Sequence, residues 1–372
     1  MTQLPPAQHR QVPVRVAGGW LAAALSLSTT RAAAQNWLAG LSNEMQAASG
    51  VCLEDCELNA RWRNPQREVS VVAGLADLHL DYEPSPWDLT ATFQKLEETR
   101  NSEQLTWREG LDTPWRWTFS GGGYVGYTDY RSMWLNEYYR QIFSGVPGYR
   151  QANPRGLNAS AGATYEYLPL SGLISWSVGW NSDEVSPAYD KLIGVPLLRG
   201  LSQYETWRFG LGSEHVLSPT LRFKQDAAAI LTTERECRYT YRADTLWAVA
   251  DTWATRFWLE GWHEGAFHSA AAAASLEHDW DAHWFAGVLT RVYRDNGQIL
   301  DPSIVVSGDA PPSDTLLVQL TLRYAGANAS WRLGVGPYLT RYAPPTAKTL
   351  RFSTLYRDRD WLCAQAAFAW QF

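Results

Sequence analysis

Apolar and polar residues alternate one by one along much of this sequence, and a period of two is typical of a β-strand whose two faces meet different surroundings. From Leu157 to Tyr167 the odd positions are apolar and the even positions are small or polar. After a turn at residues 168–172 the alternation resumes, with Ile174 and Trp176 at the start of the next apolar face. The two segments predict a β-hairpin with one apolar side.

Similar stripes recur along the rest of the chain, and each is about as long as the nine to eleven residues of a tilted membrane-spanning strand. Their apolar members are Trp207, Phe209 and Leu211; Leu221 and Phe223; Tyr239, Tyr241, Trp247 and Val249; Leu316, Val318, Leu320, Leu322 and Tyr324; and Trp331, Leu333 and Val335. The opposite side of these stripes is repeatedly charged. A soluble β-sandwich would show the same alternation, so the alternation alone leaves sandwich and barrel open.

The aromatic content favours a barrel in a membrane. The 372 residues include 20 Trp and 18 Tyr, more than one core would use, and these side chains collect at membrane–water interfaces. Pairs such as Trp115 with Trp117 and Tyr165 with Tyr167 lie at strand ends, where the aromatic girdles of a membrane barrel are expected. Closure would also leave no free edge on a sheet of so many strands. We therefore predict an all-β fold, a transmembrane antiparallel up-and-down β-barrel.

The N-terminus has the pattern of an export signal. Residues 1–34 contain a positive region with Arg10 and Arg15, an apolar stretch over residues 16–27, and small residues for cleavage before Gln35. An uncleaved membrane anchor is the alternative, although the apolar stretch is shorter than a membrane span needs. Residues 35–66 lack alternation, so we expect a periplasmic extension or part of a plug there, with the barrel over residues 67–372.

The last eleven residues carry a resemblance to a known class. Phe368, Trp370 and Phe372 occupy alternate positions, and the chain ends on the last of these aromatic residues. This segment resembles the C-terminal strand of Gram-negative outer-membrane β-barrel proteins. The resemblance implies an outer-membrane location, with the lipid bilayer, the barrel-assembly machinery and periplasmic chaperones as partners.

A last strand that ends at the periplasm fixes the direction of the others. The long connections around residues 131–156, 182–200 and 295–314 then lie outside, and the short turns at 168–172 and 214–219 lie in the periplasm. This order of long outer and short periplasmic connections holds only if the weak stripe at 350–354 is not a membrane strand, and we prefer that interpretation. We expect about 14 strands, with 12 to 16 possible. Residues 132–143 have helical spacing and are either a short helix or an ordinary loop.

Charge and cysteine content narrow the chemistry. A net charge of −6 excludes a nucleic-acid binder that works through overall charge. Cys52 and Cys56 lie four residues apart and are read as a possible local disulfide or as unpaired thiols. His263 and His268 are spaced one residue too far apart for a zinc-protease helix. We expect the polar segment 278–283 to be a solvated turn, and we predict no catalytic residue, metal or cofactor.

The polar stripe of each clear strand should line the lumen. The predicted pore-lining residues are Arg116, Glu166, Arg208, Arg222, Lys224, Asp226, Arg242, Asp244, Arg323 and Arg332. This set is net basic and favours anions, although the same charges could pair with one another and stiffen a closed lumen. The leading hypothesis is therefore a channel or export pore for small anionic solutes or acidic polymer. The alternatives are a non-transporting barrel whose outer loops bind a partner, and an outer-membrane hydrolase.

Overall fold

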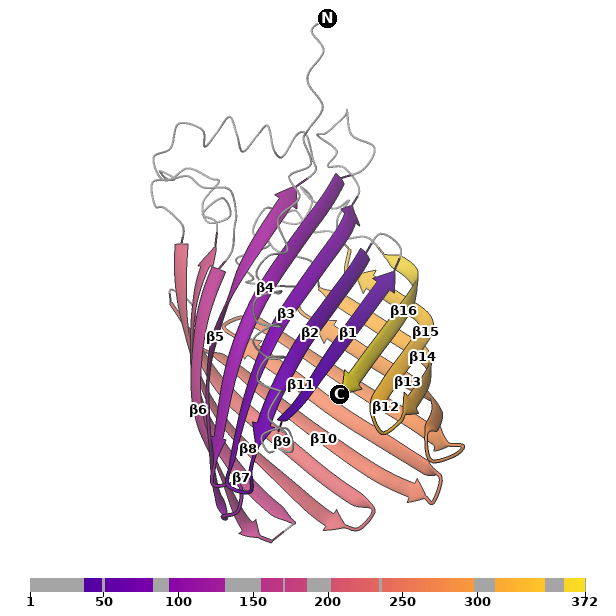
Figure 1. The fold of residues 1–372 in the computed structure, drawn as a ribbon. Coiled ribbons are helices and arrows are strands. Elements are labelled where there is room, and N and C mark those ends of the chain that lie inside the picture. Colours follow the sequence, from indigo (N-terminus) through magenta and orange to yellow (C-terminus); the bar gives the residue numbers. More distant parts are fainter. Residues whose placement is uncertain are drawn as a thin grey trace, which may run out of the picture.

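The computed structural model describes residues 37–48, 51–82, 94–130, 155–169, 171–185, 202–233, 236–297, 312–344 and 358–371. Within these residues, sixteen antiparallel strands form one closed barrel, in which each strand pairs with its neighbours in the chain and β1 pairs with β16 (Figure 1). The strands are β1 Trp37–Ala48, β2 Val51–Arg63, β3 Arg67–Tyr82, β4 Gln94–Glu109, β5 Trp115–Tyr130, β6 Arg155–Leu168, β7 Gly172–Val185, β8 Ser202–Ser218, β9 Leu221–Thr232, β10 Arg238–Ala250, β11 Trp253–Glu264, β12 Phe267–Asp279, β13 Trp284–Asp295, β14 Ser313–Ala325, β15 Ala329–Tyr342 and β16 Arg359–Gln371. This topology confirms the predicted up-and-down barrel, and the strand number is at the upper limit of the expected range.

The barrel has two different ends. At one end, here called the turn end, short connections join β2 to β3, β4 to β5, β6 to β7, β8 to β9, β10 to β11, β12 to β13 and β14 to β15, and β16 also finishes there. At the other end, called the loop end, long connections follow β3, β5, β7, β13 and β15, while short ones join β1 to β2, β9 to β10 and β11 to β12. Side chains shape the short turns: the Asn64 carboxamide oxygen accepts hydrogen bonds from the backbone N–H groups of Gln66 and Arg67, at 2.9 and 2.7 Å.

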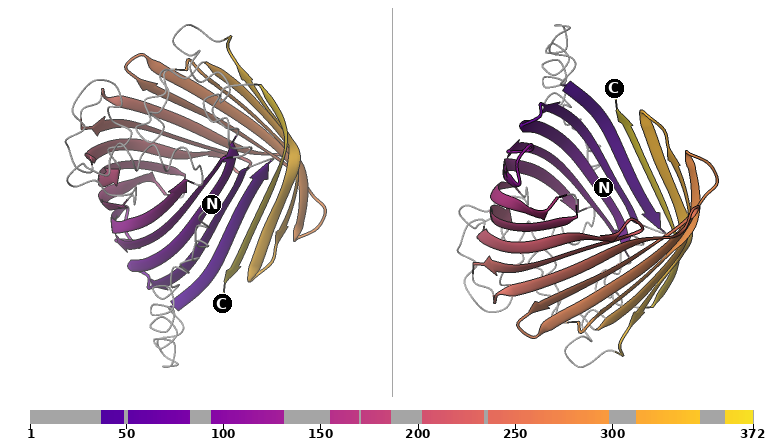
Figure 2. Two further views of the ribbon diagram at one scale, coloured as in Figure 1. Left: turned by 90° about the horizontal axis from the view of Figure 1, so that it is seen from above. Right: turned by 90° about the horizontal axis from the view of Figure 1, so that it is seen from below.

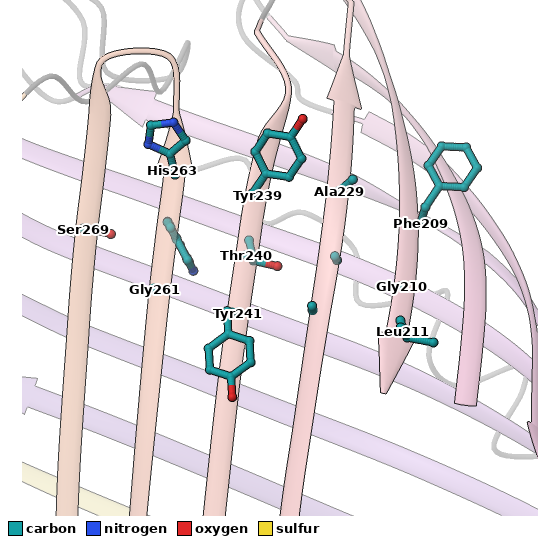
Figure 3. Close-up of a pocket in the computed structure, with 13 residues that line it drawn as sticks. Phe209, Gly210, Leu211, Ala229, Tyr239, Thr240, Tyr241, Gly261, His263 and Ser269 are labelled. Atoms are coloured by element: carbon teal, nitrogen blue, oxygen red, sulfur yellow. The ribbon is translucent and has the colours of Figure 1, made fainter. Parts of the chain in front are cut away.

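The two faces of the sheet differ in chemistry. One, called the apolar face, exposes large side chains such as Trp117, Phe209 and Leu320. Figure 3 looks at β8–β12 with the opposite wall of the barrel behind them, and the rings of Phe209, Tyr239 and Tyr241 lie on the near, outer side. The other face, called the polar face, carries most of the charged side chains. Because exposed rings suit lipid and charges suit water, the apolar face is the outer face and the polar face is the lumen side.

Aromatic rings gather on the apolar face at the turn end. The ring of Trp115 lies 4.7 Å from that of Tyr165 and 5.3 Å from that of Trp176, measured between centroids. A second cluster joins Trp284 and Trp331 at 4.9 Å. These clusters lie where the sequence predicted an aromatic girdle.

The predicted start of the barrel at residue 67 is wrong. Residues 35–66 were expected to form an extension or plug, but β1 and β2 lie in this range and close the barrel against β16. Alternation is absent there because Asn43 on β1 and Glu54 on the neighbouring strand β2 place polar groups on the apolar face. Two polar faces give no period of two, and this explains the low count of about 14 strands.

The possible disulfide is also wrong. Cys52 and Cys56 are both unpaired and lie on the same strand, β2. Four residues of extended chain separate the two Cα atoms by about 13 Å, whereas a disulfide needs them within about 7 Å.

Several sequence predictions fall outside the described residues. These are the signal segment 1–34, the possible helix at 132–143, the stripe at 350–354 and the terminal Phe372. In the part of the chain that the structure describes, no helix is long and apolar enough to cross a membrane.

Candidate functional site on the polar face of the barrel

The strand register places all ten predicted pore-lining residues on the polar face. Residues directly opposite on neighbouring strands lie on the same face, for example Lys224 with Asp244 across β9 and β10, and Arg323 with Arg332 across β14 and β15. The ring continues from Arg332 through β16 to Glu44 on β1. Charged side chains therefore lie on several parts of the inner wall, with uncharged residues such as Ala367 between them.

Five of the ten residues find a partner that lies on the same wall. Arg116 forms an ion pair with Glu166, its fellow member of the set. The other three bind residues outside the set, and these pairs are Arg222 with Glu214 at 3.0 Å, Arg256 Nε with Asp244 Oδ1 at 2.9 Å, and Arg323 with Glu277 at 3.0 Å. The sequence missed these partners because cross-strand neighbours depend on register, which alternation does not specify.

Four cations of the set have no such partner. Arg208, Lys224, Arg242 and Arg332 are exposed, and among the described residues none of them forms an ion pair. Three of them lie on the adjacent strands β8, β9 and β10. Asp226, on the same part of the wall, is also without an ion pair in the described chain. The unpaired charge on this arc is therefore mainly positive.

An acidic arc lies on the opposite side of the ring. Glu44 on β1 lies directly across from Asp55 on β2, and Glu57 follows on the same face of β2. The side chains of Gln365 and Gln46 donate hydrogen bonds to the Glu44 carboxylate, at 2.7 and 3.1 Å. Figure 2 shows β1 and β2 (indigo) across the ring from β9 and β10 (pink). The positive surplus expected from the sequence is therefore confined to part of the wall.

Aromatic rings also lie on the polar face, next to arginine side chains. The Arg242 guanidinium carbon lies 5.6 Å from the centroid of the Trp258 ring, and that of Arg291 lies 5.4 Å from the same centroid. The Arg323 guanidinium carbon lies 3.8 Å from the centroid of the Phe285 ring. The alternation in the sequence did not identify Trp258 or Arg291 as lumen residues. Trp258 stands between Phe257 and Leu259, so the two faces of β11 look equally apolar there.

Two of the histidines contact backbone carbonyl oxygens: His278 lies 3.1 Å from that of Thr252, and His283 lies 3.0 Å from that of Ala325. In the described residues, no group of three or more His, Cys, Asp or Glu side chains is placed to hold a metal ion. The predicted polar turn at 278–283 is closed by Asp281, whose carboxylate accepts the backbone N–H groups of His283 and Trp284 at 2.7 and 3.0 Å. His263 and His268 face each other across the β11–β12 hairpin.

One groove lies on the outside of the barrel. It has a volume of about 700 Å³, with alanine and glycine at its base and Phe209, Tyr239 and Tyr241 among its walls (Figure 3). This groove is shallow and lies on the apolar face. Its lining is mainly apolar, whereas most of the charged side chains lie on the polar face.

The fold is that of known membrane barrels, although the sequence is distant from them. CdiB from Acinetobacter baumannii is 9% identical, with 91% of this chain and 60% of that chain covered and a TM-score of 0.55. The toluene transporter TodX from Pseudomonas putida (7% identity, 90% and 89% covered, TM-score 0.43) and a bacterial polysaccharide outer membrane secretin (9%, 91% and 98%, TM-score 0.47) are more loosely similar. The chain spans only 60% of the length of CdiB.

The likeness to CdiB shows the fold alone, because the identity is so low. Together with the closed ring of sixteen described strands, it shows that the chain has the fold of an outer-membrane β-barrel. No model of a protein family matches this sequence, and no curated protein matches it.

Proposed function

We propose that this protein is an outer-membrane channel whose lumen favours small anionic solutes or an acidic polymer. The observation that carries the proposal is the group of exposed cations on adjacent strands, Arg208, Lys224 and Arg242, which form no ion pair among the described residues. Cations without carboxylate partners leave a positive field, and such a field attracts anions.

Barrel size supports the same function. Barrels with sixteen or more strands are wide enough for an aqueous channel, whereas eight-stranded barrels are filled by their own side chains. The inner wall carries charged side chains on both sides of the ring, and charged side chains favour water over an apolar filling. Opposed acidic and basic arcs are compatible with passage of anions along the β8–β10 side.

Ion selectivity in a planar bilayer tests this proposal. In a potassium chloride gradient, the reversal potential of the purified protein should show a preference for chloride. The double variant Arg208→Gln with Lys224→Gln should reduce that preference, because two unpaired cations leave the lumen. As a control, Arg294→Gln removes one cation from the apolar face, where Arg294 pairs with Asp314 at 2.6 Å, and should leave the reversal potential unchanged. An absence of conductance, or a cation preference, rejects the proposal.

A further inference from the structure

Trp258 lies between two arginine side chains that come from strands on opposite sides of it. Arg242 belongs to β10, the neighbour of β11, and Arg291 belongs to β13, two strands away on the other side. Both guanidinium groups lie within 6 Å of the Trp258 ring centroid, at 5.6 and 5.4 Å. A tryptophan ring at this distance attracts a cation through its quadrupole, so the ring holds two like charges near one point of the wall.

The register confirms that all three side chains are on the polar face. Trp258 pairs with Asp244 on β10 and with Ala273 on β12, and Ala273 pairs in turn with Arg291. Asp244 is one of the charged residues of the inner wall, two positions from Arg242. The three side chains therefore share the lumen surface.

Neither guanidinium forms an ion pair with a carboxylate that the structure describes. Arg108, Arg116, Arg238, Arg256 and Arg323 are arginines of the polar face with an ion pair there. Arg242 has Asp226 and Glu260 as cross-strand neighbours but forms an ion pair with neither. Arg291 has Ala273 and Leu317 as neighbours, which are apolar. Both arginines are exposed to the lumen.

We propose that Arg242 and Arg291, positioned by Trp258, form an oxyanion-binding site on the channel wall. The ligand is the carboxylate or phosphate group of a permeating solute. A guanidinium group presents a planar fork of N–H donors that matches the paired oxygens of such a group and does not match a halide. The inference deepens the proposed function and rests on it, because a solute reaches this wall only through an open lumen.

Trp258 is a positioning residue in this site, and its contribution can be separated from that of charge. Without the ring, Arg242 and Arg291 keep their charges but lose the surface that holds them together. Phenylalanine retains an aromatic face, while leucine does not. The site therefore predicts different results for two substitutions that leave the net charge of the lumen unchanged.

The test measures single-channel conductance against concentration in potassium acetate, potassium phosphate and potassium chloride. A binding site in the path makes conductance saturate, so we expect saturation in acetate or phosphate and a nearly linear rise in chloride. The two oxyanion salts distinguish carboxylate from phosphate as the preferred group, by the lower half-saturating concentration. The double variant Arg242→Gln with Arg291→Gln should raise that concentration roughly tenfold or more, since charge-assisted hydrogen bonds are lost.

A matched variant separates the site from the general field. Arg208→Gln with Lys224→Gln removes the same charge from the same wall, and we expect less than about a threefold change in half-saturation, because in the described structure Arg242 and Arg291, and not Arg208 or Lys224, lie over the Trp258 ring. Trp258→Leu should raise the half-saturating concentration nearly as much as the double arginine variant, and Trp258→Phe should restore most of the binding.

The outcomes are distinct. Equal effects of the two double variants, or no effect of Trp258→Leu in a protein that still forms channels, would overturn the site. Linear conductance in both oxyanion salts, with anion preference intact, also rejects the site but leaves the proposed function standing. A wild-type protein with no conductance or with cation preference rejects the proposed function itself.

Discussion

The outer wall of the barrel differs between β13–β15 and β2–β4. On β13–β15, Val288, Leu320 and Val335 lie side by side in register on the apolar face, and each is exposed. On β2 and β3 the same face carries Glu54 directly across from Asp77. Both regions belong to one closed sheet with continuous pairing, so the difference comes from side chains and not from backbone geometry.

The comparison shows that the apolar belt is not equally high around the barrel. On β14, every outward position from Leu316 to Tyr324 is apolar, which for a strand tilted by about 45° covers about 20 Å of the membrane. On the outer face of β4, Trp107 and Leu105 are the two apolar residues between Glu109 at the turn end and Glu103. The apolar belt there is therefore about 5 Å high. A uniform bilayer matches the first region and not the second.

Hydrogen bonds stabilise the polar groups on the β1–β4 side. The Asn43 carboxamide donates to the Glu54 carboxylate at 2.8 Å, and the Thr99 hydroxyl donates to the Asp77 carboxylate at 2.8 Å. A carboxylate that accepts such hydrogen bonds pays a smaller free-energy cost when it leaves water. The two regions should therefore respond in opposite ways to changes in the polarity of their outward side chains.

The largest expected effect comes from a charge in the apolar belt. Leu320→Arg, at mid-strand on β14, should lower the free energy of unfolding by about 2 to 4 kcal/mol. Asn101→Arg, also at mid-strand but on the outer face of β4, should cost less than about 1 kcal/mol, because its surroundings are already polar. Denaturant unfolding from lipid vesicles measures both. Equal costs would mean that lipid meets the two regions alike and would end the comparison.

A smaller effect is expected from extending the belt. Glu103→Leu on β4 replaces an exposed carboxylate of the outer face with an apolar side chain, and should raise the free energy of unfolding in vesicles by about 1 kcal/mol. Glu57→Leu makes the same kind of change on the polar face of β2, where there is no lipid to contact, and should give no gain. A gain for Glu57→Leu of the same size would show that the faces of β2 are reversed.

The same contrast explains which strands the sequence could predict. The hairpin of β6 and β7 alternates without interruption because Tyr165 and Ile174 face lipid while Glu166 faces water. On β2, Glu54 and Asp55 are consecutive, so both faces are acidic and the period of two disappears. Hydrophobic patterning detects a strand only where its faces differ, and β1 and β2 lack that difference in their loop-end halves.

The candidate site was predictable in position but not in pairing. The sequence placed Arg116 and Arg323 on the lumen side because their strands alternate clearly. It could not show that Arg323 binds Glu277, which lies two strands away, since that contact depends on the register of three strands. Contacts that cross a strand, such as that of Arg291 with Trp258, are beyond any pattern along the chain.

The smallest effects should differ in sign between the two regions, which makes them the sharpest test. Thr99→Val on β4 removes the hydroxyl that donates to Asp77, and should lower the free energy of unfolding by about 0.5 kcal/mol. Thr290 faces outward on β13, between Ala274 and Val318, and its hydroxyl binds no side chain in the described part of the barrel. Thr290→Val should therefore raise the free energy of unfolding by about 0.5 kcal/mol, because it adds an apolar group to the belt. The two variants have the same chemistry, so a shared sign in vesicle unfolding would show that local hydrogen bonding does not distinguish the two walls.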